Sequence, residues 1–148
     1  MSAPARLFHV SDLHFGAEDR AALDWFAGEV AQQRPDAVIC TGDLTMGGRT
    51  REFAAAGQWL ASLGVPVTVE PGNHDMPYYW DPLRRLVRPY DRFRAMHRLI
   101  HCELPLDQVA VVPLKTVGRA QWRLNWSKGR VRGNELNQTL AGLAAAGE

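Results

Sequence analysis

The chain has 148 residues, of which 46% are hydrophobic and 22% charged, and its formal net charge is +1. This composition excludes a disordered chain, and 2 cysteines are too few for a disulfide scaffold. Residues 1–82 carry 5 basic and 11 acidic residues, whereas residues 83–148 carry 12 basic and 5 acidic ones. The acidic half would suit the binding of cations, and the basic half would suit a phosphate-bearing ligand. A solvated basic helix face is a simpler explanation of the basic half.

No apolar run approaches the roughly 18 residues of a membrane span. The first six residues lack the basic head and apolar stretch of a secretory signal. We therefore expect a cytoplasmic protein with no membrane partner, in which Cys40 and Cys102 stay reduced. Cys40 lies in an apolar run, which favours a buried and inert thiol.

Short apolar runs alternate with amphipathic stretches over the first half of the chain. Strands are predicted at 7–10, 37–40 and 65–69. The helix predicted at 19–33 has its apolar positions three and four residues apart, and a second helix, ended by Gly64, carries the stripe Phe53, Ala56, Leu60 and Leu63. This alternation predicts an α/β fold built from βαβ units around a mostly parallel sheet.

The second half is less regular. Helical spacing over 83–100 is interrupted by Pro89, which predicts two short helices or one kinked helix. A fourth strand is expected at 109–114, loop and hairpin at 115–132, and a last helix at 134–146 with Leu136, Leu140 and Leu143 on one side. Basic residues interleave with tryptophans in 122–132, as in single-strand nucleic-acid binders, but packing of Trp122 and Trp126 accounts for the pattern more simply.

Each of the three predicted strands is followed by a polar cluster. Asp12 and His14 follow the first strand, Asp43 the second, and Asn73 and His74 the third. Ligands of parallel sheets bind at the carboxyl ends of the strands, so these side chains are expected to converge. Carboxylate, amide and imidazole groups together suit divalent Mn, Fe or Zn and argue against a thiolate site. The sequence therefore predicts a metal centre at this edge.

The same segments resemble a known family. Residues 9–16 (HVSDLHFG), 41–45 (TGDLT) and 71–75 (PGNHD) are similar to the first three signature motifs of the calcineurin-like metallophosphoesterases. The resemblance implies two mixed sheets packed face to face and flanked by helices, of which this chain carries only the N-terminal part. It also implies two divalent metal ions at the sheet edge, which clamp a phosphate and activate a bridging water.

The resemblance assigns a role to each motif residue. Asp12 and His14 would hold the first metal, Asp43 would bridge both, and Asn73 would hold the second. His74 would contact the substrate phosphate and help the leaving group, which fits an imidazole in general acid–base catalysis. Asp75 would orient His74, although it could also cap a following helix.

The segment with Gly-Asp-Leu-Thr followed by 50–53 (TREF) looks most like bacterial cyclic-nucleotide phosphodiesterases. The resemblance thus implies a small phosphodiester substrate, such as a 3',5'-cyclic nucleotide. Two alternatives stay open. One is a non-catalytic or regulatory fragment of the same fold, and the other is a phosphodiesterase acting on nucleic acid.

The chain also departs from the family pattern. The family completes its site with a later histidine and a Gly-His-x-His cluster, whereas the last histidine here is His101. His97 and His101 are four residues apart, a spacing that can hold a metal, but neither matches a family position. We therefore expect residues 1–148 to form a metallophosphoesterase domain that is incomplete at its C-terminal end. The isolated chain should then bind metal weakly, self-associate and show negligible activity.

Overall fold

Three parallel strands organise the part of the fold that the computed structural model describes, namely residues 4–77, 81–100, 104, 106, 109–118 and 129–147. The strands are β1 (Leu7–Ser11), β2 (Ala37–Thr41) and β3 (Val67–Glu70), in the spatial order β1-β2-β3. Ser11 pairs with Thr41, and Thr41 with Glu70, so the three strands end side by side. The strands predicted from the apolar runs are confirmed, with β3 starting two residues later than expected.

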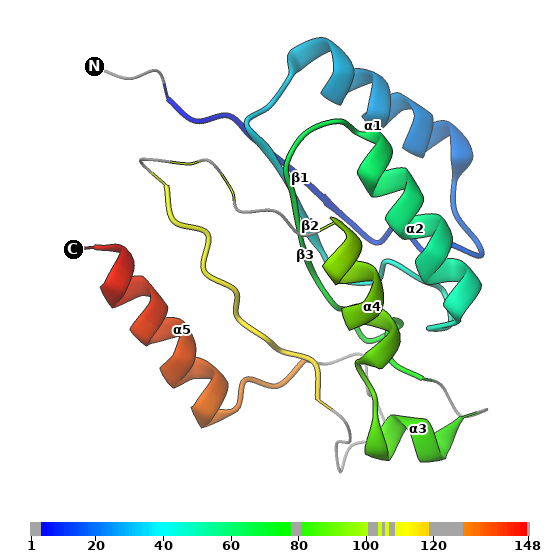
Figure 1. The fold of residues 1–148 in the computed structure, drawn as a ribbon, viewed down its shortest axis with the longest axis vertical. Helices are drawn as coiled ribbons and strands as arrows, with labels where there is room; N and C mark the ends of the chain where they lie inside the picture. The colour runs from blue at the N-terminus through cyan, green and yellow to red at the C-terminus, as the bar shows by residue number, and fades with distance from the viewer. Residues whose placement is uncertain are drawn as a thin grey trace.

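Two helices connect these strands, as the periodicity predicted. Helix α1 (Arg20–Gln33) begins at Asp19, whose carboxylate accepts a hydrogen bond from the backbone N–H of Ala22. Helix α2 (Thr50–Ser62) begins beside Glu52, a buried carboxylate that accepts from the backbone N–H groups of Gly47 and Arg49. Figure 1 shows α1 and α2 on the same side of the sheet.

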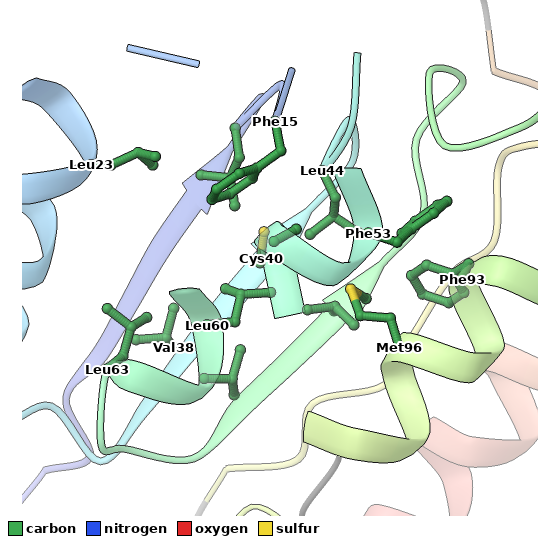
Figure 2. Close-up of a cluster of buried hydrophobic side chains, with 14 of the residues drawn as sticks. Phe15, Leu23, Val38, Cys40, Leu44, Phe53, Leu60, Leu63, Phe93 and Met96 are labelled. Carbon is green, nitrogen blue, oxygen red and sulfur yellow. The ribbon is translucent and has the colours of Figure 1, made fainter. Parts of the chain in front are cut away.

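The hydrophobic core lies between this face of the sheet and the helices (Figure 2). Val38 and Cys40 of β2 and Leu60 of α2 are each fully buried in it. Burial of such side chains is the main stabilising term in a domain of this size. Helix α4 (Asp91–Ile100) extends the core through Phe93 and Met96, with its Met96 side chain seated over Gly57 of α2.

The helical pattern of 83–100 resolves into two helices. Helix α3 (Pro82–Val87) ends before Pro89, and α4 begins after it, so the predicted interruption is confirmed. The last helix, α5 (Gly133–Ala146), is confirmed as well. Among the described residues, no helix is both long and apolar enough to cross a bilayer.

The expectation of a fourth strand at 109–114 is wrong. Residues 109–118 form neither helix nor strand, and this segment runs on the side of the sheet away from α1 and α2 (Figure 1). Pro113 has no N–H to contribute to a ladder, and its carbonyl accepts from the Thr139 hydroxyl of α5. The Thr116 carbonyl accepts from the N–H of Arg130. The hydrogen bonds described for this segment are thus made outside the sheet.

The second face of the sheet is more polar than the apolar runs of the sequence predict. It carries alternating residues of the three strands, among them Ile39 and the polar side chains His9, Ser11, Thr41, Thr68 and Glu70. His9 and Thr41 form a cross-strand hydrogen bond of 2.6 Å on it. Most of the exposed large apolar residues lie instead on the helices, where Leu140 and Leu143 of α5 are each about half exposed. A second sheet is absent from the described residues.

Candidate metal centre

The loops after β1, β2 and β3 are joined beyond the ends of the strands. The N–H of Asp12 donates to the Gly42 carbonyl at 3.2 Å, and the N–H of His14 donates to the Asp43 carbonyl at 2.9 Å. The N–H of Gly42 in turn donates to the Glu70 carbonyl at 2.9 Å. These bonds continue the strand alignment into the loops and fix the polar clusters against one another.

Asp12, His14 and Asp43 share an unusual backbone conformation. Their φ angles are 59°, 47° and 50°, in the left-handed region that residues other than glycine rarely adopt. Such residues cluster at functional sites, where the surrounding structure holds them in place. One ligand atom from each of these three side chains lies within 4.8 Å of the other two. The structure thus gathers a potential cation site from the ends of β1 and β2.

The donor set of this group fits a divalent cation. The Nδ1 atom of His14 is buried and has no hydrogen-bond partner among the described residues, while its Nε2 atom lies 3.7 Å from a carboxylate oxygen of Asp12. A buried imidazole nitrogen without a partner is unfavourable. An imidazole nitrogen with carboxylates beside it suits a borderline cation such as Zn²⁺ or Mn²⁺.

Gly72 allows the third loop to approach this group. A Cβ atom at position 72 would overlap the backbone nitrogen and carboxylate of Asp43. Only glycine therefore lets the chain after β3 pass so close to Asp43. Asn73, which follows, is half-buried and lines a cavity of about 410 Å³ together with Asp43. Asn73 and Asp43 thus line the same cavity.

His74 is held through both its backbone and its ring. Its backbone N–H donates to a carboxylate oxygen of Asp43 at 2.9 Å, and its ring Nδ1 lies 2.8 Å from the carbonyl oxygen of Met46. Its ring also meets that of His14 edge to face. These contacts bring His74 to the same edge as Asp12, His14 and Asp43.

Asp75 is buried and its carboxylate is saturated by donors. One oxygen accepts from the N–H and the hydroxyl of Thr45, and the other accepts from the N–H groups of Leu44 and Gly72, at 2.8–3.1 Å. Burial raises the pKa of Asp75, and the bonds from Gly72, Leu44 and Thr45 oppose that rise. Asp75 therefore joins the loop after β2 to the loop after β3.

This geometry revises what was expected of Asp75. The expected orienting effect on His74 can act only through the loop backbone, because both carboxylate oxygens are occupied and the Met46 carbonyl holds the ring. The alternative of a helix cap is wrong, since α3 is capped by Asp81 instead. Sequence reasoning also missed Thr45, which is fully buried, although it stands in the Gly-Asp-Leu-Thr motif itself.

His97, which was also weighed as a metal ligand, is not part of this group. His97 sits on α4 and packs against the ring of Phe93, with ring centroids 5.7 Å apart. His101, Trp122 and Trp126 fall outside the described residues.

Comparisons with known proteins relate the chain to phosphodiesterases. The chain is 36% identical over 80 residues to a glycerophosphodiester phosphodiesterase, GpdQ, of Enterobacter lignolyticus, covering 47% of this chain and 29% of that protein. It is 30% identical over 77 residues to a Synechococcus protein named "Probable cyclic nucleotide phosphodiesterase", covering 46% of this chain and 30% of that protein. The chain thus spans less than a third of the curated relatives it matches.

A solved structure supports the fold over most of the chain. The crystal structure of TT1561 of Thermus thermophilus superposes with a TM-score of 0.55 at 15% identity, covering 96% of this chain and 63% of that one. The sequence model of the calcineurin-like phosphoesterases matches residues 5–136, which include all three loops of the candidate metal centre. The chain therefore belongs to the calcineurin-like phosphoesterase family, a family of metal-dependent hydrolases.

Proposed function

We propose that the chain supplies the N-terminal part of an active site that hydrolyses small phosphodiesters with the help of two divalent metal ions. The observation that supports this most directly is the grouping of Asp12, His14 and Asp43 within 4.8 Å at the carboxyl edge of the sheet. Metal ions at such a site polarise a phosphoryl oxygen and activate a water. Two relatives that are similar to about half of the chain are named as phosphodiesterases, which supports the same interpretation.

The proposed metal-binding role of each residue follows from the strand that precedes it. Asp12 and His14, which follow β1, would hold one cation, and Asn73, which follows β3, would hold the other. Asp43 follows the central strand, between these two loops, and its carboxylate has two oxygens that can face two cations. These are four ligand side chains, whereas each such cation takes about four to six donors. We infer that further donors come from outside the described residues.

His74 is suited to transfer a proton at Nε2. The Met46 carbonyl can only accept a hydrogen bond, so the Nδ1 atom 2.8 Å away carries a proton. The nitrogen that gains and loses a proton is then Nε2. When protonated there, His74 would donate to a phosphate oxygen or to the departing alkoxide, and the fixed Nδ1 contact keeps the ring in that orientation.

The substrate class rests on the relatives. One is named for glycerophosphodiesters and one for cyclic nucleotides, and both kinds of substrate are small phosphodiesters. We propose a substrate of this class, such as a 3',5'-cyclic nucleotide. The cavity beside Asp43 and Asn73 would receive it. A buried free thiol at Cys40 accords with a cytoplasmic location.

Hydrolysis of bis(4-nitrophenyl) phosphate with excess Mn²⁺ tests this proposal. Because the ligand set is incomplete, we expect very slow turnover that requires Mn²⁺, favours the diester over 4-nitrophenyl phosphate and is absent from Asp43→Asn. Asp24→Asn, an exposed change on α1, serves as the control. A wild-type rate no higher than that of Asp43→Asn would contradict the proposal and favour a non-catalytic member of the fold.

A further inference from the structure

A second hollow, separate from the residues of the metal centre, is lined mainly by basic side chains. It measures about 250 Å³ and lies where α4, residues 115–118 and the start of α5 meet. Four of its lining residues are basic and one is acidic: Arg94, Lys115, Arg130, Arg132 and Glu135. Tyr90 also lines the hollow and is largely buried.

Tyr90 fixes one wall of this basic hollow. Its hydroxyl donates to the Val117 carbonyl at 2.6 Å, which ties the start of α4 to the 115–118 segment. The ammonium of Lys115 lies 3.7 Å from the Tyr90 ring centroid, and the guanidinium of Arg94 lies 5.9 Å from it. Both distances are within the range of a cation–π contact. The aromatic ring thus holds two cations at the hollow.

Contacts with residues 115–118 bring the two other arginines, Arg130 and Arg132, to the same hollow. The N–H of Arg130 donates to the Thr116 carbonyl at 2.8 Å, so residues 129–132 run beside 115–118. The Arg132 guanidinium lies over Gly118, 3.0 Å from where a Cβ atom would be. Arg132 is also the N-cap of α5, and the positive end of the helix dipole adds to the charge there.

The excess of basic side chains in the hollow favours an anionic ligand. Glu135 is the acidic residue lining the hollow, and Lys115 lies close enough to Glu70 to oppose the rise in pKa that burial imposes on that carboxyl. Arg94, Arg130 and Arg132 form no ion pair with a carboxylate among the described residues. Guanidinium groups match the oxygen geometry of phosphate. The Tyr90 ring is occupied by cations, which disfavours stacking of a base or other aromatic ligand.

We propose that this basic hollow binds the phosphate group of a small ligand through Arg94, Arg130 and Arg132. The inference stands on this cluster alone and does not depend on the proposed phosphodiesterase activity. Val117 lines both this hollow and the cavity beside Asp43 and Asn73, so a phosphate bound here lies next to the proposed substrate cavity.

Calorimetric titration with inorganic phosphate tests this site. The protein is first treated with EDTA, so that phosphate cannot bind through metal at Asp43. We expect saturable binding that weakens about tenfold in Arg130→Gln and in Arg132→Gln, the loss of one charge-assisted hydrogen bond. Glu135→Gln should tighten binding, because it removes the opposing charge. Added salt should weaken binding in all variants.

Two control variants distinguish phosphate binding in the hollow from binding elsewhere on the protein. Arg98→Gln removes an exposed arginine of α4 that does not line the hollow, and Asp43→Asn alters the metal centre. Both should bind phosphate as the unchanged protein does. Absence of saturable binding by the unchanged protein, or an equal loss in Arg98→Gln, would overturn the proposal. A loss confined to Asp43→Asn would also overturn it and assign the phosphate to the metal centre instead.

Discussion

The imidazole rings of His14 and His74 meet edge to face, with centroids 4.9 Å apart and ring planes at 86°. The two residues follow β1 and β3, the outer strands of the described sheet, and Asp43 follows the strand between them. The Asp43 carbonyl accepts from the N–H of His14, and its carboxylate accepts from the N–H of His74. Asp43 is thus the residue that holds both histidines at one edge.

Substitution of His74 by asparagine should separate metal binding from turnover. The His74 ring is proposed to act on the substrate, so in a version that carries the complete ligand set His74→Asn should keep its Mn²⁺ affinity and lower diester turnover about 10²–10⁴-fold. Calorimetry and the chromogenic diester assay measure the two quantities. Loss of Mn²⁺ binding in His74→Asn, or an unchanged rate, would remove His74 from the proposed role.

Gly72→Ala should damage the metal centre through sterics alone. The added methyl group would overlap Asp43, so we expect a lower melting temperature and at least tenfold weaker Mn²⁺ binding. Gly28→Ala is the matched control, because a Cβ atom at position 28 of α1 meets nothing within 4 Å. That change should stabilise the chain by about 0.5–1 kcal/mol. Equal Mn²⁺ affinities in the two variants would contradict the close approach of Gly72 to Asp43.

The sequence predicted the strand–helix alternation and the placement of polar residues at the strand ends, because both follow from local periodicity and from the geometry of parallel sheets. It could not predict how Asp75 is used, since the donors that saturate its carboxylate include Leu44 and Thr45, about 30 residues away in the chain. The strand expected at 109–114 failed for a similar reason. Val111 and Val112 fit a strand locally, but residues 109–118 form their described hydrogen bonds with Tyr90, α5 and the 129–132 segment.

Cys40 should make folding stability fall at alkaline pH. Burial, followed by the nearby charges of Asp75 and Asp12, raises the pKa of the Cys40 thiol from 9.0 to about 12. The unfolded thiol therefore ionises first, so its stabilising contribution is complete below pH 9 and is lost as pH rises towards 12. Urea unfolding of the unchanged protein should show a steeper stability loss over this range than Cys40→Ala. Parallel curves for the two proteins would contradict a buried, neutral thiol.

The exposed leucines of α5 should drive self-association of the isolated chain. Leu136, Leu140 and Leu143 are 42%, 53% and 51% exposed, and apolar surface gathered on one helix tends to be covered in solution. Sedimentation velocity should show oligomers whose population falls in the double variant Leu140→Ser, Leu143→Ser. Leu83→Ser on α3, which is 73% exposed, is the control and should leave association unchanged. A monodisperse monomer of the unchanged chain would contradict this expectation.

Calorimetric titration with Mn²⁺ tests the metal centre most directly. Asp43→Asn keeps a carbonyl oxygen that can accept from the His74 N–H but removes the charge, and it is compared with Asp12→Ala, Asn73→Ala and the surface control Asp24→Ala. We predict saturable Mn²⁺ binding by the unchanged chain and by Asp24→Ala, weaker binding by Asp12→Ala and Asn73→Ala, and the greatest loss in Asp43→Asn. Equal residual binding in the three site variants, or no binding by the unchanged chain, would contradict a shared cation site centred on Asp43.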